Sequence, residues 1–213
     1  MIFDELLGLL GQAPIFDTGF LLAGQQNPAY IQRQLTEWVR TGKLWQLRRG
    51  LYAPAPPYQK AAPHPFLVAN RMVPGSYVSL QSALAYYGLI PEYVPAVTSV
   101  SARRPGRWMT PVALFIYHRI APALLFGYER LIVGEDQTAF VAFPEKALLD
   151  LAYLQPGGDT PGYLSSLRLQ NLEQLDLDRL GHLAERAAKP KLRRAADVII
   201  ELARQEQSMY ETL

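Results

Sequence analysis

Hydrophobic residues at helical spacing predict two helices in the first part of the chain. Over residues 2–11 the apolar positions fall three and four residues apart, which places them on one face of a helix. A shorter apolar segment predicts a second helix over residues 19–23. Asp17 or Thr18 is the expected N-cap of this helix, because both side chains can accept a hydrogen bond from its free backbone amides.

A third helix followed by a hairpin completes the N-terminal pattern. Asn27 is a favourable N-cap, Pro28 fits the first helical turn, and Gly42 is expected to end the helix. After this glycine, short apolar runs over residues 44–47 and 51–53 flank a glycine with two arginines before it, which is typical of a β-hairpin. Three helices followed by a hairpin with a basic tip is the order of a winged helix-turn-helix.

The rest of the chain is expected to form a linker, a mixed domain and a helical end. Six prolines between residues 54 and 74 predict a linker over 58–75, because each proline biases the residue before it away from helix. The pattern predicts helices over 79–87 and 143–154 and strands over 98–102, 114–119, 129–133 and 138–142. From about residue 164 it predicts helix, divided at Pro190.

These elements together predict an α+β protein. We expect a winged helix-turn-helix domain over residues 1–57 and, after the linker, a mixed α/β domain over residues 76–213 that ends in a helical segment. The linker offers few side chains to bury, so the N-terminal domain is expected to separate cleanly from the rest.

Composition excludes several classes of protein. The chain has 213 residues, 49% of them hydrophobic and 19% charged, which is typical of a folded protein and not of a disordered one. No apolar run approaches the roughly 20 residues that a membrane-spanning helix needs. Acidic Asp4 and Glu5 stand where a signal peptide carries positive charge. The absence of cysteine excludes disulfides and thiolate metal sites, and together these features favour a cytoplasmic protein.

The charge distribution indicates a polyanionic partner. The formal net charge is only +2, but residues 27–60 contain six basic side chains and one acidic side chain. Residues 136–213 contain nine basic and twelve acidic side chains. Positive charge is therefore concentrated in the N-terminal part, where it can attract and hold nucleic acid.

The third predicted helix has an apolar face and an opposite basic face. On a helical wheel Ile31, Leu35, Trp38 and Val39 lie together, and Glu37 lies close enough to Arg33 to hold its guanidinium. Arginine pairs with guanine edges and amides pair with adenine edges in the major groove, whereas hairpin arginines suit phosphate or the minor groove. The predicted DNA-binding residues are Asn27, Ala29, Tyr30, Arg33, Gln34, Arg40, Arg48 and Arg49. The alternative is a solvated helix face and a charged turn.

A second basic turn is predicted in the mixed domain. Arg103, Arg104 and Arg107 surround a Pro-Gly pair. This turn either extends the DNA footprint, contacts RNA or an acidic partner, or is a solvated turn between strands.

Catalytic patterns are weak. Asp136, Glu145 and Lys146 together suggest a metal-dependent nuclease, but the adjacent Glu145 and Lys146 would point to opposite faces of a strand, and Pro144-Glu145 fits a first helical turn better. The three histidines have no paired ligand spacing, and no phosphate-binding loop is complete. We therefore expect no catalytic residues, no metal, no cofactor and no enzymatic activity.

Several segments resemble the AbiEi family of antitoxins. The N-terminal segments are Asn27 to Leu35, Arg40 to Leu44 and Leu47 to Tyr52; those in the mixed domain are Ser76 to Ile90, Phe115 to Ile120 and Ala142 to Leu151. They cover nearly the whole chain in matching order. The long proline-rich link departs from the family pattern.

The resemblance implies a type IV antitoxin of an abortive-infection (phage defence) system. Such a protein would bind inverted repeats in the double-stranded DNA of its own promoter, repress transcription and oppose a nucleotidyltransferase-like toxin. Self-association on DNA is expected, whereas a direct contact with the toxin stays open. The alternative is a stand-alone winged-helix regulator whose second domain senses a ligand or a protein.

Overall fold

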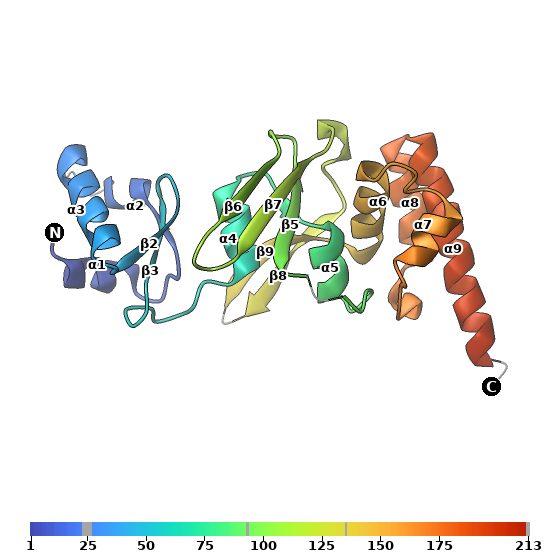
Figure 1. Ribbon diagram of the computed structural model, residues 1–213, viewed down its shortest axis with the longest axis horizontal. Coiled ribbons are helices and arrows are strands. Elements are labelled where there is room, and N and C mark those ends of the chain that lie inside the picture. The colour runs from blue at the N-terminus through green and yellow to red at the C-terminus, as the bar shows by residue number, and fades with distance from the viewer. Residues whose placement is uncertain (23–26, 93, 135, 212–213) are drawn as a thin grey trace.

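The computed structural model shows an α+β protein and describes residues 1–22, 27–92, 94–134 and 136–211, with side chains described up to residue 206. Figure 1 shows a module of small helices and short strands at the N-terminal end, a larger sheet in the middle and a group of helices at the opposite end. No helix in these described ranges is long and apolar enough to cross a membrane.

The N-terminal module is built around its own small apolar core. It contains α1 (Phe3–Leu10), β1 (Phe16–Asp17), α2 (Thr18–Leu22), α3 (Pro28–Arg40), β2 (Leu44–Arg48) and β3 (Leu51–Pro54). The strands are antiparallel, with β3 between β1 and β2. Leu6, Ile31 and Leu35 are buried at the centre of this core. The expected second helix is present as α2, while Ala23, its expected last residue, lies outside the described part.

The proline-rich segment contains a helix where the sequence predicted a linker. Residues Pro65–Met72 form α4, and Val68, Ala69 and Met72 are buried in the main core. The expectation of a linker over 58–75 is wrong for these residues, because Pro65 occupies the first helical turn, where proline is tolerated. His64 caps the helix by accepting a hydrogen bond from the Phe66 backbone amide at Nδ1, 3.1 Å away.

The larger sheet is mixed. In the described part of the chain its order is β6-β7-β5-β4-β9-β8, with β5–β7 and β4–β9 parallel and the other pairs antiparallel. Its strands are β4 (Tyr77–Val78), β5 (Ala96–Ser101), β6 (Gly106–Met109), β7 (Leu114–Arg119), β8 (Tyr128–Gly134) and β9 (Gln137–Ala142). The four strands that the sequence predicted are present, whereas β4 and β6 were not expected.

Helices cover both faces of this sheet. Tyr117 of β7 donates a hydrogen bond to the Ala69 carbonyl, so its side of the sheet faces α4. Tyr77 of β4 is bonded to Asp150, so its side faces the C-terminal helices. The elements on that side and at that end are α5 (Leu80–Tyr86), α6 (Pro144–Leu154), α7 (Pro161–Ser166), α8 (Leu177–Ala187) and α9 (Pro190–Glu211), with short 3-10 turns η1 (Pro122–Leu124) and η2 (Leu172–Gln174).

A buried polar cluster joins α6 to the sheet. Lys146 forms an ion pair with Asp150 one turn later, and both side chains are almost fully buried. Asp150 also accepts hydrogen bonds from Tyr77 at 3.0 Å and from Ser79 at 2.8 Å. Burial lowers the pKa of Lys146 and raises the pKa of Asp150, because a low-dielectric environment disfavours either charge alone.

The N-terminal module packs against the rest of the chain. Ile15, Leu47 and Leu51 belong to the same buried cluster as α4 and the larger sheet. Arg71 of α4 forms an ion pair with Asp17 of β1. The expected clean separation is therefore wrong, because this apolar surface of the module is covered by α4 and not by solvent.

Candidate nucleic-acid interface

Helix α3 begins and ends where its sequence signals predict. The Asn27 side chain accepts a hydrogen bond from the Ala29 amide at 2.9 Å, and Pro28 occupies the first turn. Gly42 follows the helix at φ +71°, a conformation that glycine adopts without strain. These two signals set where the helix begins and ends, and therefore its length.

One face of α3 is anchored in the core of the module. Ile31 and Leu35 are fully buried, and the Trp38 ring meets the Phe3 ring edge-on with centroids 5.3 Å apart. Val39 is partly buried beside them. The predicted apolar face is confirmed, and its burial fixes which side chains point outward.

The opposite face of α3 presents Ala29 and Arg33 to solvent. The Arg33 guanidinium has no hydrogen bond or ion pair to any described residue, although the negative charge of Glu37 acts on it from a distance. A small side chain beside an exposed arginine leaves room for a base edge to approach. Both residues predicted to face the DNA bases are therefore exposed.

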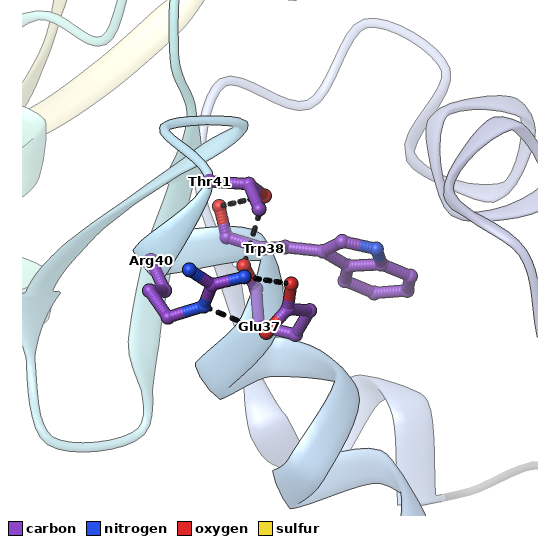
Figure 2. A network of polar contacts seen from close by, with 4 residues as sticks. All are labelled: Glu37, Trp38, Arg40 and Thr41. Atoms are coloured by element: carbon purple, nitrogen blue, oxygen red, sulfur yellow. Dashed lines mark hydrogen bonds and ion pairs between the residues drawn. The ribbon is translucent and has the colours of Figure 1, made fainter.

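Glu37 pairs with Arg40 and not with Arg33. Figure 2 shows the Arg40 guanidinium donating to both oxygens of the Glu37 carboxylate, at 2.9 and 2.6 Å. This bidentate bond is the main cause of the lowered pKa of Glu37, and the nearby Arg33 charge adds to it. The expectation that Glu37 holds Arg33 is wrong, because the planar guanidinium of Arg40 reaches both oxygens from three residues away.

Tyr30 and Gln34 lie on the flank of α3 nearest the start of the chain. The Gln34 amide donates to the Tyr30 hydroxyl at 2.9 Å and also to the Met1 carbonyl. Tyr30 is 49% exposed, whereas Gln34 is only partly exposed. The Gln34 amide nitrogen is therefore committed to intramolecular contacts, whereas its buried oxygen has no partner among the described residues, and Tyr30 is the more accessible side chain.

The hairpin tip lies against α2 and α4. Gly50, at φ +80°, accepts hydrogen bonds at its carbonyl from the amide and hydroxyl of Thr18, at 2.9 and 3.3 Å. Arg48 donates to the Met72 carbonyl, and its guanidinium lies 5.0 Å from the centre of the Trp108 ring. Arg49 is exposed and has no partner among the described residues. The two adjacent arginines therefore have different environments.

The second basic turn lies beside the hairpin. Arg103 and Arg104 are exposed in the loop before β6, and Arg107 is exposed on β6 itself. The Trp108 ring folds over Gly106, where an added Cβ would meet ring atoms at 2.2 Å. Because Arg48 contacts the same ring, Trp108 brings the hairpin next to this turn. In the sequence, the glycine two residues before the tryptophan is the sole sign of this role.

The three residues considered for nuclease chemistry have different environments and do not form one site. Asp136 is exposed in the turn between β8 and β9. Glu145 is buried in the first turn of α6 and accepts a hydrogen bond from the Asp176 amide at 2.8 Å. Lys146 belongs to the buried cluster with Asp150. In the part of the chain that the structure describes, no three His, Asp or Glu side chains form a cluster that could hold a metal ion.

Comparison with known proteins gives a fold and no function. No family model matches the sequence, and neither does any curated protein. The crystal structure of the RV2827C protein from Mycobacterium tuberculosis is similar to this one, with a TM-score of 0.51 over 91% of this chain and 76% of that chain. At 19% identity, this similarity shows a shared fold.

Proposed function

We propose that this protein is a DNA-binding antitoxin that represses its own operon in a type IV toxin-antitoxin system. The observation that carries the proposal is Arg33, which is exposed and has no partner among the described residues, on the face of α3 opposite its buried Ile31 and Leu35. The protein would bind inverted repeats in its promoter and oppose a nucleotidyltransferase-like toxin. It would act in the cytoplasm, without a metal or cofactor and without catalysis.

The order of elements in the N-terminal module supports this proposal. Helices α1, α2 and α3 are followed by the β2–β3 hairpin, and β1 pairs with β3. This order supports the proposal of a winged helix-turn-helix. In that arrangement α3 would enter the major groove, with Ala29 and Arg33 facing the base edges. Asn27 would stay at the helix start, where backbone amides approach phosphate.

Phosphate contacts would come from arginines beside the recognition helix. Arg49 is exposed at the hairpin tip and free of described partners, and Arg40 is exposed although paired with Glu37. The Trp108 ring brings the loop that carries Arg103 and Arg104 next to the hairpin. Because arginines that neutralise phosphates release counterions, the affinity for DNA would fall as the salt concentration rises.

The antitoxin role rests on the AbiEi resemblance of the larger domain. Its segments form β4 with α5, β7, and the end of β9 with α6, which are the central elements around the sheet. Tyr77, Tyr117 and Leu148 in these segments are buried. The resemblance therefore concerns the framework of the domain, and it supports a shared role without naming a contact residue.

A second candidate is a stand-alone regulator that senses a ligand. A cleft of about 500 Å³ lies beside β7, where Ile116 and His118 line it. Tyr117, between these two residues, points to the other face and contacts the Trp108 ring at 5.2 Å, on which Arg48 lies. Strand β7 would thus separate a ligand in this cleft from the Trp108–Arg48 contact with the N-terminal module.

Co-expression separates the two candidates. The full chain would be produced with the product of the neighbouring gene while growth and a reporter driven by the chain's own promoter are recorded. The first candidate predicts growth rescue and repression. Repression together with a neighbouring gene product that is not toxic favours the stand-alone regulator. Absence of both growth rescue and repression contradicts DNA-binding regulation altogether. A variant with Arg33→Ala should lose repression and retain growth rescue.

A further inference from the structure

The cleft beside β7 has the size and lining of a small-molecule site. It encloses about 500 Å³ between the sheet, α5, α6 and the end of α7. Most of the described residues that line it are apolar, among them Leu84, Ile90, Ile116, Leu151 and Leu167. Pockets of roughly 300–1,000 Å³ with apolar walls and a few polar groups are typical ligand sites.

Among the described residues that line the cleft, no charge is left unpaired at neutral pH. Glu92 at its rim is paired with Arg168, whose guanidinium donates to it at 3.2 and 2.5 Å. Burial lowers the pKa of His118 below its ordinary value of 6.5, so this imidazole is neutral at pH 7. The other described residues that line the cleft do not ionise. A charged ligand would therefore lose its hydration without gaining a counter-charge.

Two polar side chains in the cleft are available to a ligand. The Thr98 hydroxyl is already used, because it donates to the Ser79 carbonyl at 2.7 Å and accepts from the Ser82 amide at 3.1 Å. By contrast, Gln81 and His118 form no side-chain hydrogen bond to any described residue. An amide and a neutral imidazole can each donate to or accept from a ligand atom.

We infer that this cleft binds a neutral, mainly apolar small molecule that forms one or two hydrogen bonds with Gln81 or His118. Apolar area supplies the affinity, and the two polar groups fix the orientation of the ligand. The inference names the class of ligand that the stand-alone regulator would sense, and its biological role rests on that second candidate function. Its test measures binding alone, so its failure leaves DNA binding untouched.

A pair of related fluorescent probes tests the charge argument. N-phenyl-1-naphthylamine is neutral, and 1-anilinonaphthalene-8-sulfonate is the same ring system with a sulfonate. In titrations of the full chain at pH 7.5, we expect saturable binding of the neutral probe and at least about tenfold weaker binding of the sulfonate. Absence of saturable binding by the neutral probe, or equal binding of both probes, would overturn the inference.

Matched isoleucine variants locate the site. Ile116→Trp fills the cleft, whereas Ile132→Trp places the same ring on the far edge strand β8, where Ile132 is 72% exposed. We expect the first variant to weaken neutral-probe binding at least about tenfold and the second to leave it unchanged. Gln81→Trp fills the cleft from α5 and is the replacement if Ile116→Trp loses its circular dichroism spectrum. Equal loss in the Ile132 variant, or full binding by a folded variant with a filled cleft, contradicts the site.

Discussion

The guanidinium of Arg48 lies over the indole ring of Trp108, 5.0 Å from the ring centre. The same guanidinium donates to the Met72 carbonyl at the end of α4. One side chain of the hairpin thus contacts both α4 and the edge of the larger sheet. The basic tip that the sequence suggested for DNA is divided, with Arg48 joining the N-terminal module to the rest and Arg49 facing solvent.

This contact should be measurable as a coupling energy. Arg48→Ala, Trp108→Ala and the double variant form a thermodynamic cycle in urea unfolding. We predict a coupling of about 0.5–1 kcal/mol, because the cation lies over the ring while Arg48 itself is exposed. Arg49→Ala is the control and should change the free energy of unfolding by less than about 0.5 kcal/mol. Additive effects of Arg48→Ala and Trp108→Ala would show that the two side chains do not stabilise each other.

The two hairpin arginines should differ in DNA binding. Arg49→Ala is predicted to reduce the slope of log K against log[salt] by about one, because one phosphate contact is lost. Arg48→Ala should leave the slope unchanged, since its guanidinium is used within the protein. Titrations at several salt concentrations measure both slopes. A shallower slope for Arg48→Ala alone would reverse this assignment.

The buried ion pair should be costly to break from one side. Lys146→Met leaves the Asp150 carboxyl buried without its cation, and we predict a loss of about 3–5 kcal/mol in the free energy of unfolding. The double variant Lys146→Met/Asp150→Leu should recover much of this loss. Lys189→Met, at an exposed position, is the control. Urea unfolding that shows the double variant to be no more stable than the single one contradicts this account.

Stability should fall in mild acid through His64. Burial lowers the pKa of folded His64 below the ordinary 6.5, so near pH 6 the unfolded chain binds more protons than the folded chain. The stabilisation is therefore complete above about pH 6.5 and is lost as the pH falls through the lowered value of the folded state. Protonation at Nδ1 would also remove the acceptor that caps α4.

Replacement of His64 by asparagine tests this pH dependence. His64→Asn keeps a side-chain cap and has no group that titrates in this range, so thermal unfolding between pH 5 and 7.5 should vary less than in the wild type. His118→Asn measures the separate share of the other histidine with a lowered pKa. A pH profile of His64→Asn that matches the wild type would exclude His64 as the cause.

Local signals were sufficient to predict α3 and several strands. Asn27 and Pro28 mark the start of the helix and Gly42 marks its end, because caps and turns depend on residues that are adjacent in the sequence. The buried face of α3 followed from its apolar spacing. Strand β7 was predicted at its observed bounds, since its apolar run is flanked by turn residues.

Contacts between distant parts of the sequence could not be predicted. The prolines hid α4, whose burial depends on strands that come later in the chain. The Arg-Pro-Gly segment indicated only a turn. Strand β6 nevertheless begins at the glycine of this segment, because Gly106 pairs with Tyr117 of β7. Arg48 was assigned to DNA because nothing near it in the sequence indicates the Trp108 ring. Glu37 was assigned to the wrong arginine, because two were within reach and only side-chain geometry distinguishes them.

The central claim, that α3 binds promoter DNA through Arg33, is tested most directly by fluorescence anisotropy. Duplexes from upstream of the chain's own gene, and unrelated duplexes of equal length, are titrated with wild type, Arg33→Ala and the exposed control Arg193→Ala. We predict that Arg33→Ala weakens binding to upstream DNA by about 1–3 kcal/mol and reduces its preference over unrelated DNA, while Arg193→Ala binds like the wild type. Unchanged affinity and preference in Arg33→Ala would contradict the assignment of α3 as the DNA-reading helix.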